Sequence, residues 1–214
     1  MKSVVCYGDS NTWGYATVAR PDGRYSHDER WPGILRTELG TGWMVIEEGL
    51  GGRTTVNDDP VEGLERNGRT YLLPCLLTHL PIDVFVIMLG TVDLKARFNK
   101  TAWEIAAGVG ALVTIAKSAA VGRSGGAPEI LVICPPETRT DLKQFADLFT
   151  GAYEKSLQLA RHYEAMARQL GVHFLNAGAL VKSSTVDGFH LDPPEHTVLG
   201  RAVAAEIRRI AGES

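Results

Sequence analysis

The stretch Val4-Val5-Cys6-Tyr7-Gly8-Asp9-Ser10-Asn11-Thr12-Trp13-Gly14 decides how the rest of the chain is interpreted. Its first four residues are typical of a buried strand, and a polar turn that contains glycine follows them. The serine hydroxyl is therefore predicted at the carboxyl end of the first strand, where open α/β sheets bind ligands. The α/β-hydrolase elbow needs glycine two residues after its serine, and Thr12 excludes that motif here.

A serine hydroxyl is a poor nucleophile unless a base removes its proton and a third group orients that base. The stretch Asp187-Gly188-Phe189-His190, near the other end of the chain, supplies both a histidine and a carboxylate. The spacing of three residues makes Asp187 a near neighbour of His190. The sequence thus contains the three residue types that nucleophilic catalysis by serine requires.

Length and charge place the chain among ordinary globular proteins. With 214 residues it fits one large α/β domain, which we expect to span 1–214. Its hydrophobic content of 44%, charged content of 22% and net charge of −3 give no basic excess. Nucleic acid and anionic membrane surfaces are therefore unexpected partners.

The cysteines and the apolar runs bear on location. Cys6, Cys75 and Cys134 are odd in number and far apart, so we expect buried thiols in a reducing compartment rather than disulfides or metal ligands. The chain opens directly on a strand-like segment, and nowhere does it hold the run of about 18 apolar residues that a membrane helix needs. The expected location is cytoplasmic.

Hydrophobic periodicity predicts strands that alternate with helices. The expected strands are Val4–Tyr7, Met44–Glu48, Asp83–Leu89, Glu129–Cys134 and Val172–Asn176. The expected helices are Trp31–Leu39, Asn67–His79 interrupted or started at Pro74, Thr101–Ala116, Tyr153–Leu170 and Thr197–Ile210. This alternation predicts an α/β fold of three layers, flavodoxin-like, with a five-stranded parallel sheet in the order 2-1-3-4-5. That strand order places three segments side by side at the carboxyl ends of neighbouring strands: Ser10, the glycine turn at Gly52 and the loop at Gly90.

Four blocks give the sequence its likeness to a known family. They are Gly8-Asp9-Ser10, Gly51-Gly52-Arg53-Thr54, Gly90-Thr91-Val92-Asp93 and Asp187-Gly188-Phe189-His190. In this order the chain resembles the SGNH hydrolases, also called the GDSL esterase/lipase superfamily, over nearly its whole length. The flanking residues, such as Glu47-Glu48-Gly49-Leu50, look like the arylesterase and acyltransferase branch, whose members act on small acyl esters and tend to be oligomeric.

The resemblance implies a role for each matching residue. Ser10 is the expected nucleophile, His190 the general base and acid, and Asp187 the group that orients the histidine. The backbone amides of Ser10 and Gly52 are expected to donate to the oxyanion. The third donor of the family is an asparagine side chain, whereas this chain has Val92, which has no side-chain donor. Asp93 is expected to bond backbone within its own turn.

The remaining expectations concern ligands. By resemblance, Asn11, Thr91 and Phe189 would line the acyl pocket, while Trp13 and Tyr15 would face an aryl or alcohol group. No cofactor is expected, and no metal, because Asp58-Asp59 and the scattered histidines lack recognised ligand spacing. The expected partners are a small-molecule ester and further copies of this chain. Two alternatives stay open: a carbohydrate deacetylase with the same triad, and a weakened or inactive relative that binds an acylated ligand because Val92 replaces asparagine.

Overall fold

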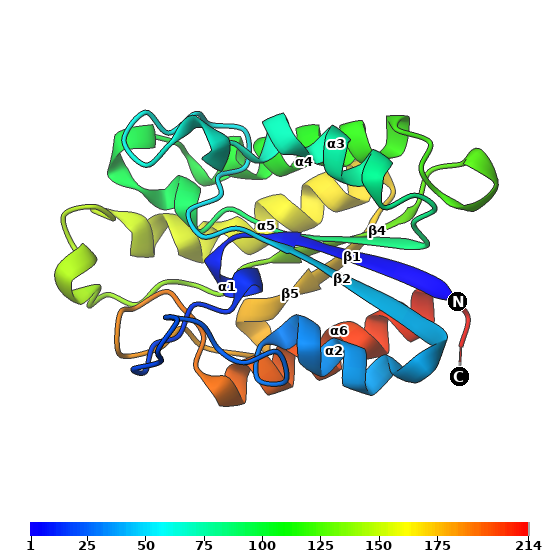
Figure 1. Ribbon diagram of the computed structural model, residues 1–214. Coiled ribbons are helices and arrows are strands. Elements are labelled where there is room, and N and C mark those ends of the chain that lie inside the picture. The colour runs from blue at the N-terminus through cyan, green and yellow to red at the C-terminus, as the bar shows by residue number, and fades with distance from the viewer. Residues whose placement is uncertain (214) are drawn as a thin grey trace.

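The computed structural model describes residues 1–213, and a parallel sheet of five strands lies at its centre (Figure 1). The strand order is β2-β1-β3-β4-β5, so the predicted order 2-1-3-4-5 is confirmed. The strands are β1 (Lys2–Gly8), β2 (Trp43–Gly49), β3 (Val84–Met88), β4 (Glu129–Cys134) and β5 (His173–Asn176). Every neighbouring pair is parallel.

Helices cover both faces of the sheet and give the three layers that the sequence predicts (Figure 1). On one face lie α2 (Trp31–Leu39) and α6 (Pro193–Ile210), and on the other lie α3 (Gly68–Thr78), α4 (Ala102–Ser118) and α5 (Ala152–Leu170). A short helix, α1 (Ser10–Trp13), follows β1 directly. The 3₁₀ turns are η1 (Gly40–Gly42), η2 (Leu64–Arg66), η3 (Val92–Leu94), η4 (Ala96–Phe98), η5 (Arg123–Gly125), η6 (Lys143–Phe145) and η7 (Ala177–Ala179).

The two hydrophobic layers follow from the alternation of side chains along the central strands. In β1, Val5 and Tyr7 pack in the layer under α3, α4 and α5, whereas Val4 and Cys6 pack in the layer under α2 and α6. Both sets are fully buried. A strand with helices on both faces has no polar side, which explains the continuous apolar runs in β1 and β3.

Two helices differ from the prediction at a proline. Pro74 neither starts nor interrupts α3, because the helix continues through it from Gly68 to Thr78. Leu72 and Cys75, on either side of that proline, are fully buried, and this packing stabilises the helix despite the lost backbone hydrogen bond. Helix α6 begins at Pro193 rather than Thr197, since proline fits the first helical turn.

No segment within residues 1–213 forms a helix that has both the length and the apolar character needed to cross a bilayer.

Candidate active site

The turn after β1 presents Ser10 as the first residue of α1. The Asp9 side chain caps this helix by accepting a hydrogen bond from the Asn11 amide at 3.0 Å, and Gly14 ends it with a φ of 90°. Gly8 makes the close turn possible, because a Cβ atom there would lie 2.0 Å from Thr12 Oγ1. The sequence predicts a polar turn at this place, and the structure instead has one turn of helix.

Ser10, His190 and Asp187 form a chain of hydrogen bonds. His190 Nε2 lies 2.8 Å from Ser10 Oγ, and His190 Nδ1 lies 2.8 Å from Asp187 Oδ2. The other oxygen of Asp187 accepts hydrogen bonds from the backbone amides of Phe189 and His190 at 3.1 and 3.0 Å. Burial opposes ionisation of Asp187, but the hydrogen bond and charge of His190 outweigh it, so the pKa of this carboxyl lies below its ordinary value. The structure therefore brings the three predicted residues together in the order that serine catalysis needs.

Asn11 holds the segment that carries His190. Its amide nitrogen donates to the carbonyl oxygen of Phe189 at 3.1 Å, and its oxygen accepts from the Leu191 amide at 3.0 Å. The side chain is only 2% exposed. Asn11 thus faces the histidine segment and positions it, and it does not line the acyl pocket as the family resemblance predicts.

The ring of Tyr15 covers the histidine from the solvent side. It stacks on the His190 ring with 4.1 Å between centroids and 17° between planes. An isolated backbone bridge between Tyr15 and Arg24 closes the polar loop that carries this ring. Tyr15 therefore limits the ways in which the imidazole can turn, a role that the sequence does not indicate.

The second and third blocks meet Ser10 at the same pocket. Gly52 and Val92 both line it, and the φ of 76° at Gly52 explains why glycine stands in this turn. Within residues 1–213, the backbone amides of Ser10 and Gly52 donate to no protein acceptor. These two N–H groups are thus available to a negatively charged oxygen. Val92 brings an apolar side chain, 5% exposed, to the place of the third donor.

Asp93 joins the third block to the second. Its buried carboxylate accepts hydrogen bonds from the Thr55 amide at 2.9 Å, the Thr55 hydroxyl at 2.6 Å and the Asn57 amide at 2.6 Å. The interpretation that Asp93 bonds backbone within its own turn is therefore wrong. The bonds reach across to the loop after Gly52 and fix the two pocket loops relative to each other.

A buried carboxyl group lies directly before the nucleophile. Asp9 is 1% exposed, and its Oδ2 atom has no hydrogen-bond partner within the described residues. Burial and the charge of Asp93 together raise the pKa of Asp9 to about 7, against the opposing effects of the hydrogen bond from the Asn11 amide and the charge of Arg53.

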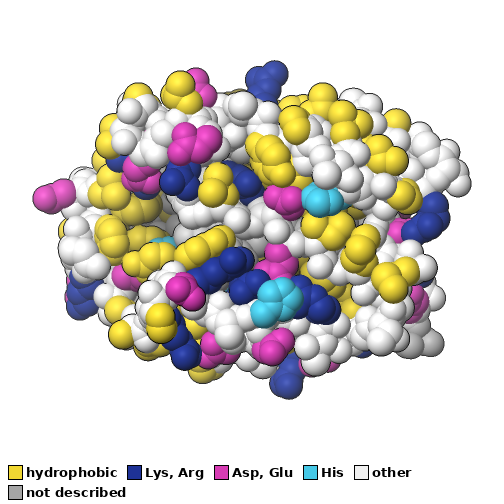
Figure 2. All heavy atoms as spheres, viewed as in Figure 1, with side chains coloured by type: hydrophobic (Ala, Val, Ile, Leu, Met, Phe, Trp, Pro, Cys, Tyr) yellow, Lys and Arg dark blue, Asp and Glu magenta, His cyan; other side chains and the backbone are white. Residues whose placement is uncertain are grey.

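The pocket above Ser10 has a volume of about 430 Å³ and two unlike walls. Its apolar wall consists of Val92, Phe145, Leu148, Phe149 and Phe189. Its charged wall consists of Glu62, Arg66 and Lys95. The face in Figure 2 is hollowed, with hydrophobic side chains gathered beside the hollow and charged side chains above it. Such a pocket combines shape selection with a few polar groups, as small-molecule sites do.

The charged wall is a connected network. Lys95 lies 2.5 Å from Glu62, and Arg97 contacts Glu62 at 2.7 Å and Asp59 at 2.6 Å. Burial opposes ionisation of Glu62 and Asp59, but the bonds to these cations outweigh it, and the pKa of each carboxyl is lowered. The wall is therefore charged at neutral pH and held in place.

The predicted substrate-binding residues divide into two groups. Phe189 lines the pocket and packs against Phe145 and Phe149. Thr91 is buried beside Val92, and Trp13 lies under the guanidinium of Arg24 at 4.8 Å; neither belongs to the pocket lining.

Most of the apolar wall is not predicted from the sequence. Phe145, Leu148 and Phe149 recur at intervals of three and four residues inside a polar loop. That recurrence is the signal that would have indicated a buried apolar face.

Comparison with known proteins identifies the family of the chain. Residues 6–198 match the model of the GDSL-like Lipase/Acylhydrolase family. Among solved structures, the inhibitor-bound aryl esterase of M. smegmatis is 41% identical, with a TM-score of 0.92 over 98% of this chain and 100% of that chain. Est24, a carbohydrate acetylesterase from Sinorhizobium meliloti, is 40% identical, with a TM-score of 0.91 over the same shares.

A search of curated proteins found no match. The two structural neighbours and the family model nevertheless agree on ester hydrolysis, and the match spans all four blocks. This chain belongs to the GDSL-like lipase/acylhydrolase family, and the comparisons support a carboxylic ester hydrolase.

Proposed function

We propose that this protein is a serine esterase that cleaves short-chain acyl esters of aryl or alkyl alcohols through an acyl-enzyme on Ser10. The observation that carries the proposal is the pair of 2.8 Å contacts that link Ser10, His190 and Asp187 at the base of the pocket. These three residues supply the nucleophile, the base and the orienting group that acyl transfer requires.

In the first half of the reaction, His190 Nε2 takes the proton of Ser10 as Oγ attacks the ester carbon. The resulting oxyanion accepts hydrogen bonds from the amides of Ser10 and Gly52. Asp187 stabilises the imidazolium and keeps its Nδ1 proton directed at the carboxylate. When the tetrahedral intermediate collapses, His190 returns the proton to the departing alcohol and the acyl group stays on Ser10.

In the second half, His190 takes a proton from water, and the hydroxide attacks the acyl-enzyme. Collapse then releases the carboxylic acid and restores the serine hydroxyl. An alcohol can replace water at this step, because the same base removes its proton. Acyl transfer to an added alcohol is therefore part of the proposal.

The shape of the pocket supports small substrates. A cavity of about 430 Å³ accommodates a short acyl chain with an aryl group, and the Phe145, Phe149 and Phe189 rings offer it an apolar surface. The similarity to the aryl esterase of M. smegmatis supports such a substrate.

A second candidate is a carbohydrate acetylesterase that uses the same triad. The charged wall of Glu62, Arg66 and Lys95 favours it, because sugar hydroxyls need donors and acceptors that an aromatic alcohol does not. Est24 shows that a carbohydrate acetylesterase is among the structural neighbours. A third candidate is a relative with weakened or no esterase activity that binds an acylated ligand, because Val92 replaces the asparagine that would donate to the oxyanion.

Burst kinetics with an aryl acetate test the proposal. The wild type is expected to release one equivalent of phenol rapidly, whereas Ser10→Ala and His190→Ala lose the burst and keep their circular dichroism. A control in the same pocket, Phe145→Leu, should keep the burst and change KM. Turnover by Ser10→Ala at the wild-type rate would refute the proposed nucleophile.

Competition between substrates separates the first two candidates. An acetylated sugar and an aryl acetate are offered together, and kcat/KM is measured for each in the wild type and in Glu62→Gln. The aryl esterase proposal predicts a preference for the aryl ester that this substitution changes little. The carbohydrate alternative predicts the opposite preference and its loss in the variant.

A further inference from the structure

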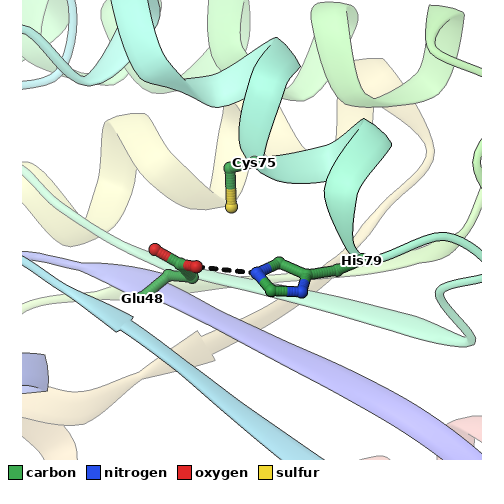
Figure 3. A group of neighbouring side chains, drawn as sticks. All are labelled: Glu48, Cys75 and His79. Atoms are coloured by element: carbon green, nitrogen blue, oxygen red, sulfur yellow. Dashed lines mark hydrogen bonds and ion pairs between the residues drawn. The ribbon is translucent and has the colours of Figure 1, made fainter.

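Outside the active site, three side chains with metal-binding atoms converge where β2 ends beside α3 (Figure 3). Glu48 comes from β2 and Cys75 from α3, and His79 is the residue that caps the C-terminal end of α3. One ligand atom from each lies within 4.8 Å of the other two, and His79 Nε2 lies 2.7 Å from Glu48 Oε1. Within residues 1–213 no other group of three such side chains is so closely placed.

The local structure explains the convergence. Cys75 and His79 are four residues apart, so they project from the same face of α3. In Figure 3 the Cys75 sulfur points toward the space that Glu48 and His79 also face. The Cys75 side chain is fully buried, while Glu48 and His79 are 18% and 22% exposed. The three donors thus form a half-sheltered cup whose open side faces solvent.

We infer that Glu48, Cys75 and His79 form a binding site for a divalent transition-metal ion of the zinc class. A tetrahedral zinc ion with its usual bond lengths holds ligand atoms about 3.3–3.8 Å apart. The present distances need only small side-chain movements to reach that range: Glu48 and His79 separate slightly, and the sulfur approaches them. Water from the open side supplies the fourth ligand.

The donor set selects the class of ion. One thiolate, one imidazole and one carboxylate suit zinc and cobalt, whereas magnesium and calcium prefer sites made only of oxygen atoms. The thiolate is the form that binds, so coordination releases the Cys75 proton to solvent and leaves a sulfur–metal bond. Without an ion, burial and the charge of Glu48 raise the pKa of Cys75 to about 12 against the opposing charge of Arg53, so the charge of the bound ion is what stabilises the thiolate.

An ordinary ion pair does not account for all three residues. Glu129 and His173 form a pair of the same kind, with 3.1 Å between His173 Nε2 and Glu129 Oε2, but no thiol completes it. That pair therefore provides a matched control. Cys75 and His79 are close in sequence, but the third ligand, Glu48, comes from another element, so ligand spacing gave no sign of a complete site.

Cobalt titration of the reduced, metal-free protein tests the inference. A thiolate bound to Co²⁺ gives an intense charge-transfer absorption band, and we expect that band to saturate at one equivalent and to vanish when Zn²⁺ displaces the cobalt. Cys75→Ser should abolish the band. His79→Gln and Glu48→Gln should each weaken cobalt binding by more than about tenfold. Loss of a residue that only hydrogen-bonds to a metal ligand already costs about that much affinity, and loss of a ligand should cost more.

Controls distinguish the site from general effects. His173→Gln and Cys134→Ser should bind cobalt as the wild type does, and thermal unfolding of the wild type should shift upward with Zn²⁺. If Cys75→Ser fails to fold, the two variants at the exposed side of the cup carry the test. The inference is overturned if saturating Co²⁺ gives no band, if the band persists in Cys75→Ser, or if His173→Gln weakens binding as much as His79→Gln. None of these readouts depends on esterase activity.

Discussion

Replacing Val92 by asparagine is expected to accelerate the reaction. The Val92 side chain is 5% exposed, lines the pocket with Ser10 and Gly52, and begins the turn η3. Asparagine is close to valine in size but carries an amide that donates hydrogen bonds. At this position the amide would give the oxyanion a third donor beside the two backbone N–H groups.

The size of the effect follows from what such a donor contributes. Removal of one oxyanion donor from a serine hydrolase costs about 10²–10³ in kcat, or about 3–4 kcal/mol of transition-state stabilisation. Because the bond forms chiefly in the transition state, Val92→Asn should raise kcat by up to that factor and change KM much less. Burying an amide in place of valine should lower the free energy of unfolding by about 1–3 kcal/mol.

Steady-state kinetics on one aryl acetate measures the effect, and Val92→Asp is the matched control. Aspartate has the shape of asparagine but, when ionised, can only accept hydrogen bonds and repels the oxyanion. It should therefore lower kcat. An unchanged kcat in Val92→Asn, a change confined to KM, or equal gains from both variants would show that another donor already serves the oxyanion.

Three further predictions follow from the site and the surface. Asp187→Asn should lower kcat by about 10⁴, less than the about 10⁶ expected for Ser10→Ala, because asparagine keeps the size but not the charge that holds the histidine tautomer; equal losses would contradict this. Because the folded pKa of Asp9 is raised to about 7, its contribution to stability is complete below the ordinary aspartate pKa and is lost as pH rises toward 7. Asp9→Asn should therefore flatten the dependence of the unfolding free energy on pH between about 4 and 7, and parallel urea-unfolding profiles for the two proteins would contradict this. The chain should self-associate through α3, which exposes the apolar side chains of Leu73 and Leu77, with exposed Leu80 just beyond its end. Light scattering should show a mass above that of one chain, reduced by Leu77→Glu, and a monomeric mass at micromolar concentration would end the idea.

The parts of the site that the sequence reveals are those that strand ends position. Ser10 lies two residues after the end of β1, and the order of the strands alone brings it beside the turn at Gly52 and the loop at Val92. The pair of Asp187 and His190 is recognisable because both lie within four residues of chain. Local spacing and parallel topology therefore suffice for the core of the site.

The remaining parts depend on the paths of loops, which local patterns do not determine. The stacking of Tyr15 on His190 and the position of Glu62 and Lys95 in one wall arise from segments without regular structure. The role of Asn11 shows the same limit, since its amide bonds to residues that are 178 and 180 positions away. Such contacts follow from the folded arrangement and not from any period in the sequence.

Covalent labelling shows directly whether Ser10 is the nucleophile. A serine-reactive phosphonate is added to the wild type and to His190→Ala, and mass spectrometry identifies the modified residue and its rate of modification. If Ser10 is the nucleophile, we expect one phosphonyl group per chain, located on Ser10, and labelling at least about 10²-fold slower without the His190 base. Labelling at another residue, or equal rates in the two proteins, would contradict it.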